Sequence, residues 1–436
     1  MADPDAVLCP HCTQPTVSFT RMVLSLSQLM DFVHPRVSDH QLRVAYIAVR
    51  IAERLGFCES RRLEMLHAGA LHDIGLIRVE DRLRILAMSL QEDMSWHEKT
   101  GHLLLKDVDL LSNAAEFIRY HHVSFADAQA SQAAIPFESH ILAMADCFER
   151  RLARDRHVLE QVDEVREYFL GQAGKEFEPR CVSALAEAWG RESFWLDCAY
   201  GNIRGLLEDQ MDWPALQLGQ SQLEDVAKVF AMVVDARSQW TAAHTAGVAA
   251  TADMLGEAMK LPPHERSMLR TAAYLHDLGK LVVPTEILDK AGPLTAQEQC
   301  IVRSHTYHTY RVLNSIGGMP QISQWAAFHH ERLDGRGYPF GLGGDDLCLG
   351  ARIMAVADVF TAITEDRPYR KGMPREQAMN VLQEQVRGGG LDGDIVAALR
   401  SRFEVINEIR MMQQQTYGVQ QREVMRLSMH PQAAVA

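Results

Sequence analysis

The chain carries the same ordered set of histidines and aspartates twice, and this repeat limits most strongly how it can fold. The first half carries His40, His72, Asp73, His97, His121, His122 and Asp146. The second half carries His244, His276, Asp277, His305, His329, His330 and Asp358. The first two histidines are 32 residues apart in both halves (72 − 40 and 276 − 244), and the third and fourth are 24 apart in both (121 − 97 and 329 − 305). We infer an internal duplication, with one repeat in each of two domains.

Apolar residues near these histidines follow helical spacing. Val44, Ile47 and Ile51 recur every three to four residues after His40, which places that histidine on the buried face of a helix. The stretch after His244 has the same pattern. Strand-type alternation never runs long enough to predict a sheet. We therefore predict an all-α fold of two tandem helical bundle domains.

The expected domain boundaries follow from the repeat and from local breaks in the pattern. They give a flexible tail at 1–17, an N-terminal domain at 18–212, a second domain at 213–408 and a helical, frayed tail at 409–436. Trp213-Pro214 breaks any helix between the repeats. Ser221 and Glu224 form a capping-box pattern that predicts the start of the next helix. Cys9 and Cys12 make only half of a zinc knuckle, so we expect two free thiols.

Composition places the chain among globular proteins of a reducing compartment. Its 436 residues include eight scattered cysteines without a disulfide pattern, and the formal net charge is −13. That charge argues against a nucleic-acid polymer or a membrane surface as partner. No apolar run reaches the roughly 18 residues that a membrane span needs. The acidic start of the chain does not resemble a secretion signal, so we expect a cytoplasmic protein.

The second set of residues has the chemistry of a metal centre. Imidazoles and carboxylates without a thiolate suit Fe, Mn, Zn, Co or Ni. Asp277 lies between histidine-rich half-sites and could bridge two ions, which are about 3.5–4 Å apart in two-metal phosphoesterases. A buried cluster of this kind without metal would leave many polar atoms unsatisfied.

Several motifs of the second half resemble the HD-GYP family of cyclic dinucleotide phosphodiesterases over residues 220–408. They are the run His276-Asp277-Leu278-Gly279-Lys280, then His305, the run HHERLDGRGYP from His329 to Pro339, and Asp358 followed by RPYRK from Arg367 to Lys371. The resemblance implies that all seven residues of the second set bind a pair of divalent ions, with Asp277 as the bridge. It favours Fe or Mn, with Ni, Co and Zn as alternatives.

The resemblance also implies roles in handling the substrate. Lys280 would contact the scissile phosphate and act in catalysis with Asp277, while Arg367 and Arg370 would grip the phosphates. The substrate-binding set implied is Lys280, Arg332, Tyr338, Arg367 and Arg370. Asp334 would orient Arg332 or a ligand histidine. The Gly-Tyr-Pro loop would shape the pocket and serve as a contact surface for a protein partner.

Two departures from the family pattern affect the expected chemistry. Trp240 stands where members with a third metal carry Glu, so we expect two metals and a linear dinucleotide as the main product. Thr309 stands where the family usually has Gly. The adjacent His308 is either an extra ligand or a surface residue, and we favour the surface.

The first repeat keeps the ligand positions and loses the groups that handle phosphate. Leu76 replaces the equivalent of Lys280, and the residues after His122 contain no Gly-Tyr-Pro. Its seven residues either bind metal without catalysis or only pack and hydrogen-bond, and we favour metal binding. We expect this domain to be regulatory or dimerising, so a homodimer is one expectation. Removing residues 1–205 should then change activity or oligomeric state without abolishing hydrolysis.

The leading functional hypothesis is hydrolysis of cyclic di-GMP to linear pGpG. Alternatives are hydrolysis of cyclic GMP-AMP or another cyclic dinucleotide, and a receptor that binds the nucleotide without cleaving it and signals through protein contacts. A generic HD-type nucleotidase is a further alternative, weakened by the Gly-Tyr-Pro loop.

Overall fold

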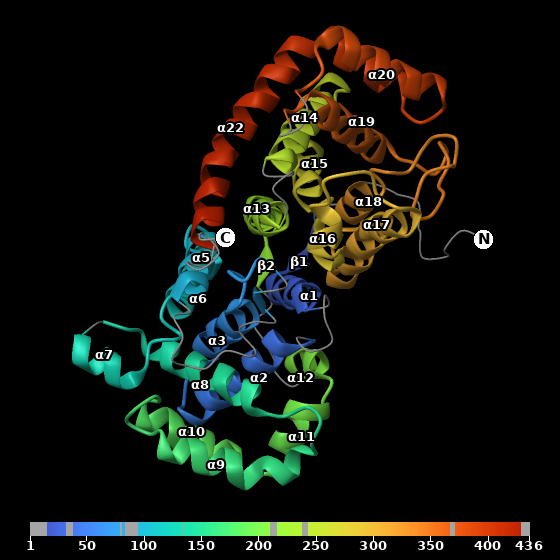
Figure 1. Ribbon diagram of the computed structural model, residues 1–436. Coiled ribbons are helices and arrows are strands. Elements are labelled where there is room, and N and C mark those ends of the chain that lie inside the picture. Colours follow the sequence, from blue (N-terminus) through green and yellow to red (C-terminus); the bar gives the residue numbers. More distant parts are fainter. Residues whose placement is uncertain are drawn as a thin grey trace. The chain divides into compact units, whose positions relative to one another are not determined.

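The computed structural model describes residues 15–31, 38–78, 81–82, 95–132, 134–209, 216–237, 243–366 and 371–428. Helices make up nearly all of the regular structure of these residues, and the strands among them are two pieces of two residues each (Figure 1). The prediction of an all-α fold is therefore confirmed. Cys9, Cys12, Trp240, Arg367 and Arg370 lie outside the described residues.

The chain separates into two compact units that alternate along the sequence. Among the described residues, the N-terminal unit comprises 19–209, 216 and 426–428, with the gaps given above. The C-terminal unit comprises 15–18 and 217–425, again with those gaps. No helix in the described part of the chain has both the length and the apolar character that crossing a bilayer requires.

The N-terminal unit is a helical bundle around α2. Its helices are α1 (Phe19–Asp31), α2 (His40–Arg54), α3 (Glu59–Leu71), α5 (Ser95–Leu105), η1 (Asp109–Leu111), α6 (Ser112–Ile118), α7 (Phe125–Ser131), α8 (Phe137–Arg151), η2 (Val158–Gln161), α9 (Val162–Gly171), α10 (Pro179–Ala188), α11 (Glu192–Tyr200) and α12 (Ile203–Asp209). Helix α2 packs against α3, α8 and α10, and α5 packs against α6. Val44, Ile47 and Ile51 are fully buried, as the helical spacing predicts.

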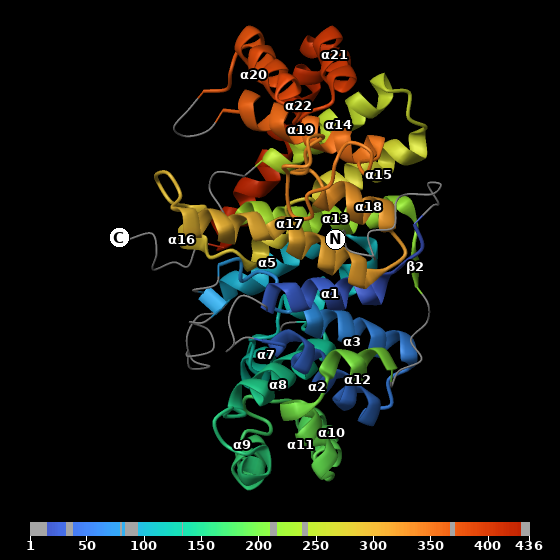
Figure 2. The same ribbon diagram turned by 90° about the vertical axis from the view of Figure 1, so that its right-hand side faces the viewer.

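The C-terminal unit repeats this arrangement with longer connections. Its elements are β1 (Val17–Ser18), β2 (Gln217–Leu218), α13 (Gln220–Ala236), α14 (His244–Ala258), α15 (Pro263–Leu275), η3 (Leu278–Val282), α16 (Thr285–Leu288), α17 (Ala296–Ile316), α18 (Pro320–Ala327), α19 (Leu349–Thr364), α20 (Arg375–Arg387), α21 (Gly393–Ser401) and α22 (Phe403–Ser428). Helix α14 packs against α15 and α19, and α17 packs against α18 (Figure 2). Helix α17 also packs against η3.

The segment at 15–18 belongs to the C-terminal unit, although it stands at the start of the chain. Val17 pairs with Leu218 in an antiparallel ladder and is fully buried. The backbone N–H of Thr16 donates to the carbonyl of Gly318 at 2.9 Å. The expected flexible tail at 1–17 is therefore wrong for its last two residues, because a ladder with a distant segment leaves no periodic pattern in so short a stretch.

Two other expected boundaries move for local reasons. Helix α13 begins at Gln220, one residue before Ser221, because Gly219 is its N-cap and the Gln222 side chain accepts a hydrogen bond from the Gly219 N–H at 3.0 Å. At the other end, the expected border between 408 and 409 falls inside α22. This helix continues to Ser428 because it buries Tyr417, Gln421 and Val424.

Candidate metal centre

Five helices of the C-terminal unit bring the second set of histidines and aspartates together. His244 is the first residue of α14, and His276-Asp277 follows the last residue of α15. His305 lies within α17 and Asp358 within α19. His329-His330 follows the end of α18 by one residue. The ends of helices therefore supply most of the set, where the backbone turns and side chains can converge.

Distances between the side chains show a compact cluster with Asp277 at its centre. Asp277 places Oδ2 3.3 Å from His276 Nε2 and Oδ1 3.4 Å from His305 Nε2. His244 Nε2 lies 3.0 Å from Asp358 Oδ1. The three groups His305/His329/His330, His244/His276/Asp358 and His276/Asp277/His329 each bring their ligand atoms within 4.8 Å of one another. Asp277 thus offers one oxygen to each side, the geometry expected of a bridging ligand.

Backbone carbonyls orient three of the imidazoles toward this cluster. The Nδ1 atoms of His276, His305 and His329 lie 2.7, 2.6 and 2.7 Å from the carbonyls of Ala273, Val302 and Ala326. An imidazole that donates from Nδ1 presents its Nε2 lone pair on the other side. His305 Nε2 and His329 Nε2 are 3.4 Å apart, so two lone pairs would face each other. A shared cation relieves that repulsion, and the donor set therefore fits a metal.

A buried carboxylate holds the first histidine from behind. Glu365 Oε2 lies 3.1 Å from His244 Nδ1 and also accepts a hydrogen bond from Gln414 Nε2 at 3.2 Å. Gln414 belongs to α22, and its Oε1 accepts from Arg410. The sequence reasoning missed Glu365 and Gln414, because both lie outside the ligand motifs. Glu365 contacts His244 across a long sequence separation, and Gln414 acts only through Glu365.

Burial and neighbouring charge together set the ionisation of the cluster. Burial alone would raise the pKa of Asp277, but His276 and Lys280 hold it well below its ordinary value. Burial alone would lower the pKa of Lys280, and the Asp277 carboxylate raises it instead. Their contact is close, with Lys280 Nζ 2.5 Å from Asp277 Oδ2. Burial lowers the pKa of His305 to about 3, so this imidazole stays neutral and its nitrogen is available as a ligand.

A pocket of about 400 Å³ opens beside the cluster. It is lined by Leu294, Gln299, Val302, Arg303, His330, Arg332, Arg336, Gly337 and Tyr338. His330 is the shared residue, since it belongs to both the cluster and the pocket wall. The guanidinium of Arg303 lies over the Tyr338 ring, 4.4 Å from its centroid. Arg303 was missed by sequence reasoning, although it precedes His305 by only two residues.

Two features hold the loop after His330 in place: the Glu331 carboxylate, which binds its backbone, and the close packing of Gly337 against the Glu331 backbone. Glu331 accepts hydrogen bonds from the backbone N–H groups of Phe340 and Leu342 at 2.7 and 3.0 Å. A Cβ at Gly337 would stand 2.4 Å from the Glu331 Cα, so only glycine fits there. Asp334 accepts from Arg332 Nη2 at 2.9 Å and therefore orients Arg332, one of the two roles expected for it.

Thr309 has a structural role in the turn that carries His276 and Asp277. Its hydroxyl accepts from the Gly279 N–H at 2.9 Å and donates to the His276 carbonyl at 3.1 Å. The side chain thus ties α17 to this turn, which explains a residue larger than glycine at that position. His308 is half-buried and belongs to none of the metal-competent groups found in the described residues.

The first-half set also converges, within the N-terminal unit. His40, His72 and Asp73 form one metal-competent group, and His97, His121 and His122 form another. Asp146 joins the first group, with Oδ1 3.5 Å from His40 Nε2.

Of the residues expected to bind substrate, Lys280, Arg332 and Tyr338 lie at or beside the second-half cluster. Arg367 and Arg370 lie outside the described residues, so their place stays a prediction.

Comparison with known proteins identifies an HD domain in each half. One HD-domain family model matches residues 37–151 and another matches residues 228–395. The chain is 29% identical to the 3'3'-cGAMP-specific phosphodiesterase 1 of Vibrio cholerae over 87% of this chain and 90% of that protein. It is 26% identical to the 3'3'-cGAMP-specific phosphodiesterase 3 of the same organism, over 90% and 96%.

Other similarities concern only part of the chain or the fold alone. The cyclic di-GMP phosphodiesterase of Pseudomonas aeruginosa is 39% identical over 34% of this chain and 36% of that protein. A crystal structure of a cyclic GMP-AMP specific phosphodiesterase of V. cholerae matches with a TM-score of 0.60 at 22% identity, covering 90% of this chain and 98% of that one. With an HD domain in each half and relatives of this kind along its length, the chain belongs to the HD-GYP family of metal-dependent cyclic dinucleotide phosphodiesterases.

Proposed function

We propose that the C-terminal unit hydrolyses 3'3'-cGAMP to a linear dinucleotide, using a pair of divalent ions bound by the second-half set. The observation that carries this proposal is the convergence of seven histidine and aspartate side chains beside a pocket lined by three arginines and Tyr338. Nitrogen and oxygen donors favour Fe or Mn, with Ni, Co and Zn as further candidates. Bound in this cluster, two cations neutralise phosphate oxygens and make a water more acidic.

The chain's own residues position the substrate in this proposal. The ammonium of Lys280 contacts Asp277, the proposed metal bridge, and therefore lies next to the place of the scissile phosphate. There it neutralises the non-bridging oxygens of that phosphate. Arg332 and Arg336 line the pocket and bind the second phosphate. The Tyr338 ring stacks with a base of the substrate, and the Arg303 guanidinium lies over that ring. A linear product follows if two metals bind, as the absence of Glu at position 240 leads us to expect.

The substrate preference rests on which relatives match the whole chain. Two relatives that match 87% of this chain or more carry 3'3'-cGAMP in their names. The relatives named for cyclic di-GMP match 43% of the chain or less. Most of them are more similar to this chain over that shorter segment than the two cGAMP-specific relatives are over the whole chain. Hydrolysis of cyclic di-GMP to pGpG, the leading hypothesis from the sequence, is therefore the second candidate.

A turnover assay on a panel of cyclic dinucleotides tests both candidates. The full chain is loaded with Mn or Fe and compared with Asp277→Ala, with the exposed Asp345→Ala as matched control. Because even residues behind metal ligands typically cost 10- to 100-fold, we expect Asp277→Ala to lower kcat by at least about 100-fold. We expect kcat/KM for 3'3'-cGAMP to exceed that for cyclic di-GMP by at least about tenfold, a difference of about 1.4 kcal/mol.

Two outcomes would contradict this proposal. Equal turnover by Asp277→Ala and the unaltered chain would remove Asp277 from the mechanism. Tight binding of a cyclic dinucleotide without cleavage, in metal-loaded protein, would favour the alternative of a receptor that signals through protein contacts at the loop around Tyr338.

A further inference from the structure

The N-terminal unit builds a second cluster with the same architecture as the first. His40 begins α2, His72-Asp73 follows α3, His97 lies in α5, and Asp146 lies in α8. Asp73 again stands in the middle, with Oδ2 3.6 Å from His40 Nε2 and 3.5 Å from His72 Nε2. Its other oxygen, Oδ1, lies 3.5 Å from His97 Nε2. One carboxylate therefore faces two half-sites, as Asp277 does in the C-terminal unit.

Buried nitrogen atoms without a hydrogen-bond partner point into this cluster. His72 Nδ1 lies 2.8 Å from the Gly69 carbonyl, and His121 Nδ1 lies 2.7 Å from the Ile118 carbonyl. The Nε2 atom of each ring has no hydrogen-bond partner, and both side chains are fully buried. Buried polar nitrogens are nearly always satisfied in folded proteins, so two such atoms in one cluster call for a partner. A metal ion is the partner that an Nε2 lone pair fits.

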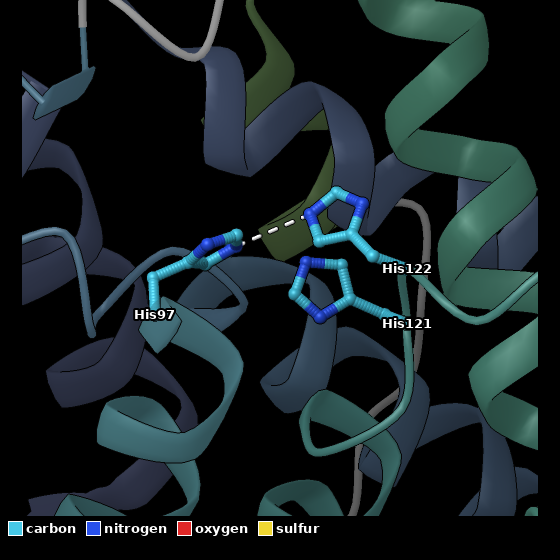
Figure 3. Close-up of side chains that lie close together, drawn as sticks. All are labelled: His97, His121 and His122. Carbon is cyan, nitrogen blue, oxygen red and sulfur yellow. Dashed lines mark hydrogen bonds between the residues drawn. The ribbon is translucent and has the colours of Figure 1, made fainter. Parts of the chain in front are cut away.

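The second half-site has the spacing of a chelate. His97, His121 and His122 turn toward one another from α5 and from the turn after α6 (Figure 3). The Nε2 atoms of His97 and His122 are 3.1 Å apart. Two nitrogens on one ion, each about 2.1 Å from it in tetrahedral or octahedral geometry, are separated by roughly 3.0–3.4 Å. The main-chain N–H of His122 donates to Glu98 at 2.7 Å, which fixes the turn that carries two of these rings.

Polar contacts behind the cluster hold its ligands in the same manner as in the C-terminal unit. Glu149 Oε2 lies 2.5 Å from His40 Nδ1, as Glu365 lies behind His244. The two glutamates occupy different positions relative to the last aspartate of their cluster, 149 − 146 = 3 and 365 − 358 = 7 residues later. Glu149 lies within α8, whereas Glu365 follows the end of α19. A histidine that only packs in the core does not require a carboxylate at its Nδ1. A ligand histidine does, because that contact fixes the ring and raises its basicity.

The residues that would act on a phosphate are replaced. Leu76, fully buried, stands where Lys280 stands in the other unit. The cation beside this cluster is Arg150, which donates from Nη2 to Asp146 Oδ2 at 2.9 Å. Arg150 therefore occupies the outer oxygen of a cluster carboxylate and leaves Oδ1 facing His40 and His72.

We propose that the N-terminal unit binds its own pair of divalent transition-metal ions, with Asp73 as the bridge, and that this centre stabilises the unit without hydrolysing a nucleotide. This inference is independent of the activity proposed for the C-terminal unit. It predicts about four metal ions per chain, twice the content of a single two-metal centre.

Metal content of the full chain tests the proposal directly. The protein is prepared without a polyhistidine tag, loaded with Mn²⁺, freed of excess metal and measured by plasma mass spectrometry. We expect about four ions in the unaltered chain, about two in Asp73→Ala, about two in Asp277→Ala and almost none in the double variant. The exposed Asp107→Ala, also in the N-terminal unit, should keep the full content.

Stability supplies a second measurement that does not depend on turnover. In the Asp277→Ala chain, adding Mn²⁺ should raise the Tm, because an ion that binds only the folded state stabilises it. The increase should be absent in the double variant. Circular dichroism checks folding, and His122→Gln replaces Asp73→Ala if that variant is unfolded. An unaltered chain with about two ions, undiminished by Asp73→Ala or His122→Gln, would overturn the proposal.

Discussion

At the scale of single residues, we propose that Lys280 couples the metal centre to the substrate. Its ammonium contacts Asp277, and the same contact raises the lysine pKa, so the side chain remains charged at neutral pH. Lysine is not a metal ligand when protonated. Its loss should therefore affect the chemical step while the ions remain bound.

Lys280→Met should lower kcat by about 100-fold, the typical cost of losing one charged or polar stabiliser of a transition state. Metal content should stay unchanged, which separates this effect from loss of a ligand. The exposed Lys260→Met is the matched control. A variant that keeps full kcat would show that Lys280 only neutralises Asp277.

His67 makes the N-terminal unit sensitive to acid. Burial lowers its pKa to about 3, from an ordinary value of 6.5, and its Nε2 lies 3.3 Å from the Thr20 hydroxyl. The folded protein therefore keeps this ring neutral, while the unfolded chain takes up a proton as the pH falls through 6.5. The stability that the neutral ring contributes is present above that pH and is lost as the pH falls toward about 3.

The unaltered chain should lose about 1 kcal/mol more unfolding free energy than His67→Gln between about pH 7 and pH 5.5. Urea unfolding at both pH values measures this difference, and the exposed His157→Gln is the control. An identical loss in the unaltered chain and in His67→Gln would show that another group controls the acid response.

The residues that share a motif were predictable, and those that only support them were not. Neighbouring His-Asp and His-His pairs at repeated spacings led to all seven positions that converge in each unit. Glu365 and Gln414 escaped because a hydrogen bond across 365 − 244 = 121 residues leaves no local pattern. Arg303 escaped for a similar reason, since its partner Tyr338 is brought close only by the folded loop.

At the scale of elements, helix α22 supports the centre from outside the region that the HD-domain model matches. That model ends at residue 395, whereas α22 begins at Phe403. Gln414 on this helix donates to Glu365, which in turn holds His244. Arg410 reinforces the contact through the carbonyl of Thr364 at 3.2 Å. The helix thus acts on the orientation of one proposed ligand, His244, through Glu365.

Gln414→Ala should weaken metal binding or lower kcat by about 10-fold, the lower end of the range for residues behind a ligand. Titration of apoprotein with Mn²⁺ and turnover at saturating metal separate the two effects. Gln415→Ala, the exposed neighbour on the same helix, is the control. If both variants bind metal and turn over substrate equally well, α22 has no influence on His244.

Element types were predictable from spacing, and element ends were less so. The buried stripe after His40 identified α2, since helical spacing of apolar residues has few alternative explanations. Helix α13 begins earlier than predicted, because Gly219 is its N-cap and not Ser221. The border expected between 408 and 409 falls inside α22, since this helix begins at Phe403 and continues without a break to Ser428.

At the scale of the whole molecule, the duplication extends to backbone packing that motifs do not reveal. A Cβ at Gly75 would stand 2.1 Å from the His97 carbonyl, and a Cβ at Gly279 would stand 2.0 Å from the His305 carbonyl. Glycine at both positions lets the turn carrying each His-Asp pair approach the helix carrying the third histidine. Both units therefore inherited one way of assembling the cluster.

The strand at the start of the chain completes the C-terminal unit, so its loss should weaken that unit. Val17→Asp should lower the unfolding free energy by roughly 3 kcal/mol, because a buried valine is lost and an unpaired charge is added. Thr16→Ala is the control, since Thr16 is exposed and uses only its backbone in this contact. Urea unfolding, followed by a probe in the C-terminal unit, measures the difference. Equal stability of the two variants would show that the ladder contributes nothing.

This strand changes the expected result of removing residues 1–205. That truncation deletes Thr16 and Val17 along with the N-terminal unit, so lower activity could arise from the missing strand alone. The regulatory or dimerising role proposed for the N-terminal unit is better tested with variants inside that unit. Asp73→Ala leaves β1 in place and serves this purpose.

The ladder between Val17 and Leu218 also sets an order of events on the ribosome. Val17 is synthesised 218 − 17 = 201 residues before its partner, which corresponds to roughly 10–40 s at ordinary rates of translation. During that interval the residues between them can emerge and fold, while the strand stays unpaired. Val17 therefore has to wait for its ladder partner until residue 218 of the 436 has been made.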